Sequence, residues 1–368
     1  MKFVGPKAYI HIDRLIHNLR NIRYYIGDRP MMCVVKANGY GHGAIEIAKN
    51  LDLESEIILA VFSFEEAIEL RKAGIKNEIF TFSKLRKEYL QLADELRITL
   101  NACSFSNIKV LSEYQKQNHS VPKFHLKFDT GMTRLGFDEN ICDEVFEYIM
   151  HHHLLPEGLY SHFATADEGN LSYAEYQLDK FKTVLNKASE YGIEFKYVHC
   201  SNSGAVLNLP DSYFNLIRIG MLLYGIAPSN EVPMNIKVKP VMSFCGPIVN
   251  LRRVKAGTQI SYGGVYSTDK DTNIGVVQTG FADGLPRNWY KDGYVSYKGN
   301  HYKIVGRICM DQLMIDFNEE NPKDGDEVLF FGKKDRDEIK VEDIAQKIGT
   351  TTYVLLTAIQ GRTKRIIL

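Results

Sequence analysis

Lys36 ends a short apolar run, MCVVK, and a loop with three glycines, Gly39, Gly41 and Gly43, follows it at once. A lysine amine can condense with an aldehyde to form a Schiff base, and glycines let the backbone approach a ligand closely. The stretch GYGHG matches neither the GxxxxGK[ST] nor the GxGxxG phosphate motif, so the glycines alone do not identify the ligand. Lys36 is a candidate for covalent chemistry, and the alternative is an ordinary lysine at the end of a strand.

Other polar side chains also stand at the ends of apolar runs. They are Asn101, Lys127, Asp129, His162, His199 and Arg218. Inside a packed core such groups would be unpaired, so each needs a neighbour or a ligand. Ser203, Gly220 and Met221 follow the last two runs, where parallel barrels commonly bind phosphate through free backbone N–H groups. A lysine on the first run and a phosphate site after the last two indicate pyridoxal phosphate, bound to Lys36 as a Schiff base.

These residues need a scaffold, and the pattern of apolar runs between residues 30 and 220 supplies one. The runs are residues 32–36, 57–62, 78–82, 97–101, 123–129, 157–163, 195–200 and 214–220. The stretches between them, such as YAEYQLDKFKTVLNKASEYG, repeat apolar residues at helical spacing and end in glycine. Strands that alternate with helices in this way predict a parallel (β/α)8 TIM barrel, in which chemistry lies at the carboxyl ends of the strands.

The residue composition and the hydrophobic pattern of the sequence change after Asn235. Segments such as NIGVVQTG and HYKIVGRICMDQLMIDF carry glycine and β-branched residues between turn signals and show little helical period. We therefore predict an α/β chain of two domains: a cofactor-binding barrel at residues 1–236 and a C-terminal, mainly-β domain at residues 237–368. No low-complexity linker separates them, so we expect the two domains to touch.

The composition excludes several classes of protein. The 45 basic and 45 acidic side chains cancel, which argues against nucleic acid as a partner. No apolar run approaches the roughly 18 residues of a membrane span, and the start of the chain lacks a signal-peptide core. Six dispersed cysteines without a CxxC pair suggest reduced thiols. We expect a cytoplasmic protein without a metal site, and we interpret the three histidines at 151–153 as a solvated helix end.

Several motifs contain the candidate residues and occur in order along the chain. They are VVKANGYGHG (Lys36, Tyr40), LKFDTGMTRLG (Lys127, Arg134), SHFATADE (His162), HCSNSGA (His199, Asn202, Ser203), RIGMLLYG (Arg218, Gly220, Met221), SYGGVY (Tyr262) and VGRICMDQLMID (Arg307, Cys309, Met310, Asp311). Together they cover essentially the whole length. On these motifs the chain resembles bacterial alanine racemase, a family of pyridoxal-phosphate enzymes with a β/α barrel and a β domain.

The resemblance implies that two bases on opposite faces of the cofactor interconvert L-alanine and D-alanine. Lys36 would exchange the α-proton of the D-enantiomer, and Tyr262 that of the L-enantiomer. A phenol has a pKa of about 10, so Tyr262 needs nearby positive charge to act as a base at neutral pH. By the resemblance, His162 and Arg218 form the hydrogen-bonded chain that provides it.

The resemblance also implies a head-to-tail homodimer with shared active sites, in which Tyr262 of one subunit serves Lys36 of the other. Met310 would lie at the substrate carboxylate. The partner's segment would supply further residues that bind the substrate or support the site: Asp311, Arg307 and Cys309.

Arg218 would donate to the pyridine nitrogen of the cofactor, and a guanidinium cannot accept a proton there. The ring nitrogen would stay unprotonated, the carbanion would be short-lived, and reprotonation would compete well with transamination. Related barrel decarboxylases place an acidic residue at that nitrogen, which argues against decarboxylation. Arg134 would pair with the cofactor's phenolic oxygen and the substrate carboxylate, and Lys127 matches a lysine that some members carry as a carbamate. The other implied cofactor contacts are Tyr40, Asn202, Ser203, Gly220 and Met221, with His199 in support.

Two positions depart from the family pattern. Phe281 stands where many members have tyrosine, which removes a hydroxyl contact near the entrance. Gly361 stands where some members have a tyrosine near the cofactor phosphate, so either the phosphate contact would be looser or Tyr40 would carry more of it. A racemase of serine, of lysine or of a broader range of amino acids stays open, because a methyl or hydroxyl group changes binding by only about 1–3 kcal/mol. Single-barrel, non-catalytic cofactor carriers lack a β domain, so residues 237–368 disfavour that reading. Alanine, racemised for peptidoglycan synthesis, is the substrate that the resemblance implies.

Overall fold

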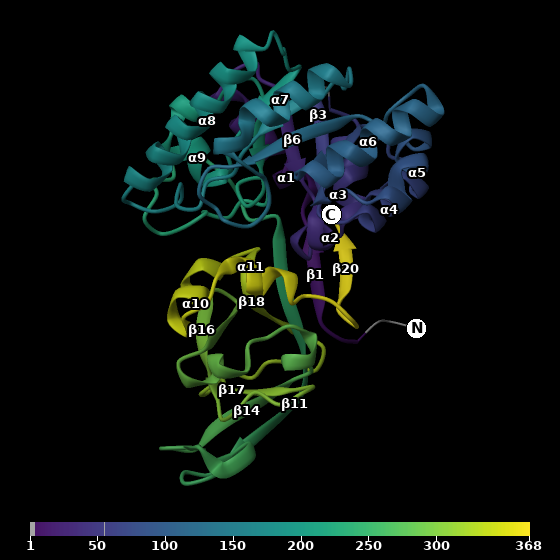
Figure 1. The fold of residues 1–368 in the computed structure, drawn as a ribbon. Coiled ribbons are helices and arrows are strands. Elements are labelled where there is room, and N and C mark those ends of the chain that lie inside the picture. The colour runs from purple at the N-terminus through teal and green to yellow at the C-terminus, as the bar shows by residue number, and fades with distance from the viewer. Residues whose placement is uncertain (1–3, 55) are drawn as a thin grey trace.

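The computed structural model describes residues 4–54 and 56–368, which form two units of different architecture (Figure 1). The purple-to-teal unit wraps helices around a parallel sheet, and the green-to-yellow unit holds most of the antiparallel strands. Strands β1 (Lys7–Ile10) and β20 (Lys364–Ile367), from opposite ends of the chain, pair in parallel where the two units meet. The ends of the chain therefore tie the two units together.

Parallel strands form the barrel, in the order β10-β2-β3-β4-β5-β6-β8-β9. Their bounds are β2 Met31–Val34, β3 Ile57–Val61, β4 Glu78–Lys84, β5 Ile98–Ala102, β6 Phe124–Asp129, β8 Gly158–Tyr160, β9 Tyr197–His199 and β10 Ile217–Ile219; the short β7, Phe137–Asp138, pairs with β6. Asn215 N–H donates to Val198 O, and Val198 N–H donates to Asn215 Oδ1 at 2.6 Å, which closes the ring between β9 and β10. Every predicted apolar run overlaps one of these strands, and the predicted barrel is confirmed.

The helical segments of this unit connect the strands, and the longer helices bury one face each. They are α1 Ile12–Ile26, α2 Lys36–Tyr40, α3 Ala44–Leu51, α4 Phe64–Lys72, α5 Leu90–Glu95, α6 Phe105–Asn118, α7 Cys142–His151, α8 Ser172–Glu190 and α9 Ser203–Asn208. Helix α4 begins with a capping box, in which Ser63 Oγ accepts from Glu66 N–H and the Glu66 carboxylate accepts from Ser63 N–H. Strands β2 and β3 are buried at every residue, which explains why their sequences, MMCV and IILAV, are continuous apolar runs.

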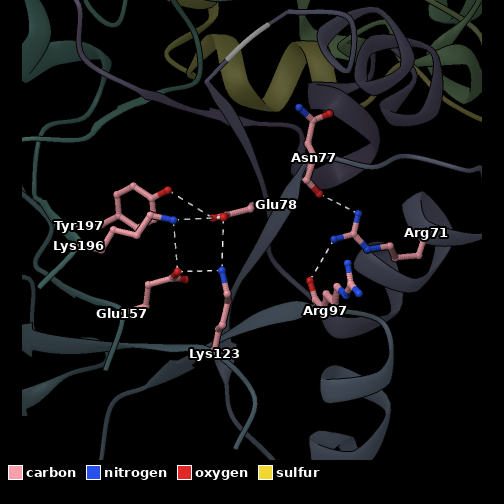
Figure 2. A network of polar contacts seen from close by, with 8 residues as sticks. All are labelled: Arg71, Asn77, Glu78, Arg97, Lys123, Glu157, Lys196 and Tyr197. Atoms are coloured by element: carbon pink, nitrogen blue, oxygen red, sulfur yellow. Dashed lines mark hydrogen bonds and ion pairs between the residues drawn. The ribbon is translucent and has the colours of Figure 1, made fainter. Parts of the chain in front are cut away.

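A network of opposite charges lies at the amino-terminal ends of the barrel strands (Figure 2). The ammonium groups of Lys123 and Lys196 each contact the carboxylates of Glu78 and Glu157, at N–O distances of 2.8–3.4 Å. The four residues begin or directly precede β4, β6, β8 and β9, so the network connects strands across this end of the barrel. Exposed pairs of this kind contribute about 0–1 kcal/mol each. The carboxyl ends of the strands lie on the other side of the barrel, where active sites of such barrels are found.

The second unit is built on a mixed sheet in the order β19-β18-β15-β16-β17-β14-β11-β1-β20. The bounds of its elements are β11 Met242–Val254, β14 Thr272–Val277, β15 Tyr294–Tyr297, β16 Asn300–Val305, β17 Leu313–Asp316, β18 Glu327–Lys334 and β19 Asp337–Ile339, with a hairpin of β12 Gln259–Ile260 and β13 Tyr266–Ser267 and the helices α10 Val341–Ile348 and α11 Thr352–Thr357. The predicted mainly-β C-terminal unit is confirmed.

Strand β1 shows one feature that the sequence did not indicate. It precedes the barrel in sequence, yet it pairs with β11 and β20 in the second sheet. The N-terminal residues 7–10 therefore lie with the β unit, although the predicted first domain begins at residue 1. The boundary predicted between residues 236 and 237 stays a prediction.

The remaining expectations concern single segments. The run of three histidines closes helix α7, which ends at His151. All six cysteines are free thiols, and Cys309 is the one that is not buried. Among the helices of residues 4–54 and 56–368, none is long and apolar enough to cross a membrane.

Candidate active site

A cavity of about 560 Å³ opens at the carboxyl ends of the barrel strands. Its lining brings together many of the residues that the sequence singled out: Lys36, Tyr40, Lys127, Arg134, His162, Asn202, Ser203, Arg218, Gly220 and Met221. Asn101 and Asp129 are not among them, because Asn101 donates to Phe82 O and Asp129 accepts backbone N–H groups of the following loop. Lysine, histidine and arginine side chains from separate strands therefore converge on one space.

Lys36 opens a turn of unusual handedness. The next four residues, Ala37, Asn38, Gly39 and Tyr40, all have positive φ, between 50° and 62°. Glycine and asparagine tolerate this left-handed conformation, whereas it costs other residues about 1–2 kcal/mol each. The turn reverses the chain directly after β2 and brings both Lys36 and Tyr40 to the cavity.

Two side chains hold this turn in place. Glu66 Oε1 accepts from Ala37 N–H at 2.7 Å, and Asn38 Oδ1 accepts from Ala44 N–H at 2.9 Å, at the start of helix α3. Strained backbone persists where neighbouring groups over-determine it, and it is concentrated at functional sites. The turn is therefore a built part of the cavity.

The environment of Lys36 favours its neutral amine. Burial lowers the pKa of the ammonium group, and the positive charges of Arg134 and Arg218 lower it further, while Glu66 acts in the opposite direction. A neutral amine is the form that attacks an aldehyde and the form that accepts a proton from carbon. Lys36 is thus prepared for the chemistry that its position suggests.

Arg218 is held by buried acceptors on both terminal nitrogens. Nη1 lies 2.8 Å from His199 Nδ1 and 3.1 Å from His199 O, and Nη2 lies 3.0 Å from His162 Nδ1 and 2.9 Å from Ser161 O and Cys200 O. None of the bonds among the described residues uses Nε. The structure therefore fixes the guanidinium and leaves one N–H of Arg218, a cavity-lining residue, for a ligand.

The contact with Arg218 also assigns the proton on His162. A guanidinium donates only, so Nδ1 of His162 accepts and its proton lies on Nε2. Burial, and then the positive charge of Arg218, holds the pKa of His162 well below its ordinary value. His162 is a neutral imidazole that offers an N–H donor at Nε2.

Hydroxyl groups line the part of the cavity after β9 and β10. Ser203 Oγ accepts from Gly220 N–H at 3.0 Å, and a Cβ added at Gly220 would lie 2.9 Å from the phenol oxygen of Tyr40. Asn202 directs its side chain locally, since Oδ1 accepts from Ala205 N–H at the start of α9. A small anion in this region would meet the hydroxyl donors of Tyr40 and Ser203.

Tyr353 is a cavity residue that the sequence analysis missed. It lies on helix α11 of the second unit, with its ring centroid 5.8 Å from that of Tyr40. Gly361, where a missing tyrosine was expected to weaken the phosphate contact, is exposed and does not line the cavity. Tyr353 therefore places a second tyrosine beside Tyr40 in the cavity.

Asp167 and Tyr160 also line the cavity without having been singled out. Both fall inside segments that the sequence analysis quoted, so their proximity to His162 was the available signal. Tyr353 offered no such signal, because nothing in the pattern around it differs from an ordinary short helix.

Lys127 and Arg134 occupy the side of the cavity formed by β6 and the loop after it. Lys127 is 5% exposed, and burial lowers the pKa of its ammonium group to about 8. Asp129 accepts from the N–H groups of Gly131, Thr133 and Arg134, which shapes the loop that carries Arg134 to the cavity.

A second group of predicted residues lies elsewhere in the same chain. Tyr262, Arg307, Cys309, Met310 and Asp311 are all in the β unit, and none lines the cavity. Ser261 Oγ donates to Arg307 O and lies 3.7 Å from Cys309 Sγ, so the two segments are adjacent. Tyr262 is 68% and Met310 56% exposed. Asp311 pairs with Arg362 at 2.6 Å.

The cavity residues fit pyridoxal phosphate. Lys36 supplies an amine with a lowered pKa for the aldehyde, and Arg218 supplies an unused donor for a ring nitrogen that carries a lone pair. Tyr40, Tyr353 and Ser203 place hydroxyl groups on the lining after β2, α11 and β9. The cavity is large enough for a ligand of this size.

Comparison with known proteins agrees with this geometry. Residues 10–228 match the family described as "Alanine racemase, N-terminal domain", and residues 241–367 match "Alanine racemase, C-terminal domain". The alanine racemase of Desulforamulus reducens is 38% identical over 364 residues, which cover 98% of each chain. The structure of alanine racemase from Clostridium difficile 630 matches with a TM-score of 0.92 at 35% identity, over 100% of this chain and 97% of that one. Alanine racemase from Bartonella henselae with covalently bound pyridoxal phosphate matches with a TM-score of 0.89 at 25% identity, over 100% of both chains.

Proposed function

The chain belongs to the alanine racemase family, and from this premise we propose which of its residues carry out the reaction. It is a pyridoxal-phosphate-dependent isomerase that interconverts L-alanine and D-alanine, and in this family the reaction supplies D-alanine for the cell wall. The residue roles below rest on the positions of the side chains and on the family resemblance.

We assign the cofactor contacts to groups that line the cavity. Lys36 bonds the aldehyde carbon, Arg218 Nε donates to the ring nitrogen, and the phosphate is bound by Tyr40, Ser203 and the backbone after β9 and β10, through Asn202, Gly220 and Met221. Tyr353 is added to this set because its ring lies beside that of Tyr40. Pyridoxal phosphate, when bound, withdraws electrons from the α-carbon of the amino acid and so makes its α-proton acidic.

Lys36 is the base for D-alanine in this proposal. Its amine must be neutral to accept a proton at Nζ, and burial together with two neighbouring guanidinium groups supports that state. Arg134 binds the substrate carboxylate, and Lys127, as a carbamate, orients Arg134.

Tyr262 of the partner subunit is the base for L-alanine. The cavity of one chain contains no Tyr262, whereas the exposed phenol on the β unit is available to a second copy. A head-to-tail homodimer brings the partner's Met310 and the partner's Asp311 to the substrate. The Nε2–H of His162 is then the donor that stabilises the phenolate, and Arg218 adds positive charge behind it.

One observation carries the assignment: the buried residue paired with His162 and His199 is an arginine and not a carboxylate. An arginine cannot deliver a proton to the ring nitrogen, so the cofactor remains a weaker electron sink and the α-carbon is reprotonated quickly. This favours racemisation over decarboxylation and transamination.

The test is chiral analysis of purified protein loaded with cofactor, run in deuterated water from each enantiomer of alanine. We expect interconversion of both enantiomers, and Tyr262→Phe should suppress deuterium exchange from L-alanine more than from D-alanine. Equal and undiminished exchange from both would remove Tyr262 as the base. Parallel reactions with serine and lysine decide whether the specificity is broader than alanine.

A further inference from the structure

A buried row of histidines continues from Arg218 into the barrel, away from the cavity. His125, on β6, places Nδ1 3.0 Å from Nε2 of His199, and His125 is 2% and His199 0% exposed. His125 does not line the cavity, and none of the proposed contacts uses it. A buried titratable side chain in hydrogen-bond contact with the residue behind Arg218 requires an explanation.

Arg218 determines where the protons lie along this row. Its Nη1 can only donate, so Nδ1 of His199 carries a lone pair and the proton of His199 lies on Nε2. That N–H donates to Nδ1 of His125, whose own proton therefore lies on Nε2. Burial lowers the pKa of His125 to about 3, and the ammonium groups of Lys123 and Lys196 act in the same direction (Figure 2). Both imidazoles are neutral, and in each of them Nδ1 accepts a hydrogen bond while Nε2 carries the proton.

The barrel is built around the ring of His125. Gly158 of β8 lies opposite His125 in the strand register, and a Cβ there would lie 2.8 Å from Cγ and Nδ1 of the ring. Phe80 stacks on the ring of His125 at 4.8 Å and 29° between planes, and Tyr160 stacks on His199 at 4.8 Å and 8°. Glycine on one strand and aromatic rings on the neighbouring strands leave these imidazoles little freedom to rotate.

We infer that His125 is a positioning residue for the racemase: it accepts the Nε2–H of His199, keeps His199 neutral and oriented, and thereby holds Arg218 as a fixed donor toward the cofactor ring. The inference rests on the proposed contact between Arg218 and the ring nitrogen. A carboxylate in place of His125 would instead favour the doubly protonated form of His199. The Nδ1–H of that imidazolium would then face the N–H of Arg218 Nη1 and repel it. A neutral acceptor is the chemistry that this position needs.

The consequence for the reaction follows from the freedom of Arg218. If its guanidinium moves, the ring nitrogen is free to take a proton from water and the cofactor becomes a stronger electron sink. With the cofactor bound, proton return to the cofactor carbon instead of the α-carbon, followed by addition of one water molecule, would release alanine as pyruvate and leave its amino group on the cofactor. His125 should therefore affect the ratio of pyruvate formed to alanine racemised, which a purely structural residue would not change.

The first measurement is histidine-selective ¹⁵N NMR of the holoenzyme and of the full chain without cofactor. His125, His162 and His199 should all show protonated Nε2 and unprotonated Nδ1 from pH 6 to 9. A proton on Nδ1 of His199, or a titrating imidazolium at His125, overturns the inference without reference to activity.

The second measurement compares two variants. His125→Leu removes the acceptor, and we expect a kcat about 10–100-fold lower, an unchanged KM for alanine and a higher pyruvate-to-racemisation ratio. His125→Gln retains an acceptor oxygen and should restore most of the wild-type kcat and most of the wild-type pyruvate-to-racemisation ratio. The control is Thr81→Val, a buried barrel substitution that removes the hydrogen bond to Thr99 O and should lower the melting temperature without changing the ratio.

Arg218→Lys separates this inference from the proposed function. If Arg218→Lys leaves the pyruvate ratio unchanged, the assigned role of Arg218 fails. If Arg218→Lys raises the ratio and His125→Leu leaves it at the wild-type value, the role of Arg218 stands and the inference about His125 fails.

Discussion

At the scale of single residues, burial in the cavity lowers the pKa of two lysines. Lys36 must be neutral to accept a proton, and its pKa lies below the ordinary 10.5 because of burial and neighbouring positive charge. Racemase activity should therefore rise as pH increases on the alkaline side of neutrality, with a midpoint below 10.5. Glu66 opposes the shift, so Glu66→Gln should move the rise to lower pH, measured as kcat between pH 6 and 10.5. Glu69→Gln, exposed on the same helix, is the control and should leave the profile in place; an identical profile for both variants would contradict the role of Glu66.

The buried ammonium group of Lys127 lowers the free energy of unfolding at neutral pH. Its folded pKa is about 8 and its ordinary value is 10.5, so the unfolded chain binds more protons between these values and the free energy of unfolding rises with pH there. Lys127→Met should remove this rise. At pH 7 in CO2-free buffer it should stabilise the fold by up to about 3 kcal/mol, from the 1.36 kcal/mol that each pKa unit represents. In buffer that contains CO2, racemase activity should fall because the carbamate that orients Arg134 is lost.

Denaturant unfolding of wild type and Lys127→Met at pH 7 and pH 10 measures this effect. Lys109→Met, exposed on α6, is the matched control and should change the free energy of unfolding by less than about 0.5 kcal/mol. If Lys127→Met lowers the free energy of unfolding at pH 7, the buried ammonium group of Lys127 does not destabilise the fold.

At the scale of elements, the left-handed turn after β2 also carries the contact between the two units. A Cβ at Gly41, with φ 82°, would lie 2.1 Å from Leu356 O of helix α11, which also carries Tyr353. Gly41→Ala should therefore displace α11, lower the melting temperature and weaken retention of the cofactor. Gly74, with φ 87° and no atom within 4 Å of an added Cβ, is the control. Gly74→Ala should lower stability only by the cost of left-handed backbone for alanine, about 1–2 kcal/mol, and leave cofactor retention unchanged. If both variants lose the same stability and the same cofactor retention, the contact of Gly41 with α11 is not the cause.

The elements also separate what sequence predicts well from what it does not. The barrel strands were predictable because buried parallel strands are continuous apolar runs flanked by periodic helices. The left-handed turn was not, because the glycines after Lys36 permit positive φ but do not indicate which hydrogen bonds will hold Ala37 and Asn38 there. Tyr353 was missed for a related reason: its role depends on how α11 docks on Gly41, a contact between residues more than 300 positions apart in sequence.

At the scale of the whole molecule, the two ends of the chain join the sheet of the β unit. A strand near residues 7–10 could be expected from the sequence, but its pairing with β11 and β20 depends on long-range register, which local pattern does not encode. The candidate site shows the same limit. Motifs identified both Lys36 and Tyr262, whereas only the fold reveals that one lines the cavity and the other is exposed on the β unit of the same chain.

This separation leads to a prediction about assembly. If each active site combines Lys36 of one subunit with Tyr262 of its partner, Lys36→Ala and Tyr262→Phe homodimers should both be nearly inactive. Mixing the two variants under conditions that allow subunit exchange forms hybrid dimers with one site that carries both defects and one site that carries neither. With random exchange about half of the dimers are hybrids, so the mixture should recover about a quarter of the wild-type activity.

Racemase assays before and after exchange, with native mass spectrometry to follow the hybrid dimer, measure this recovery. Mixing two separately prepared samples of Lys36→Ala is the control and should restore nothing, because every site then lacks the amine. A mixture of the two variants that stays inactive, although native mass spectrometry shows the hybrid dimer, would place both bases in one chain. In that case Tyr262 would have to reach the cavity of its own barrel, which the exposed position of its phenol on the β unit argues against.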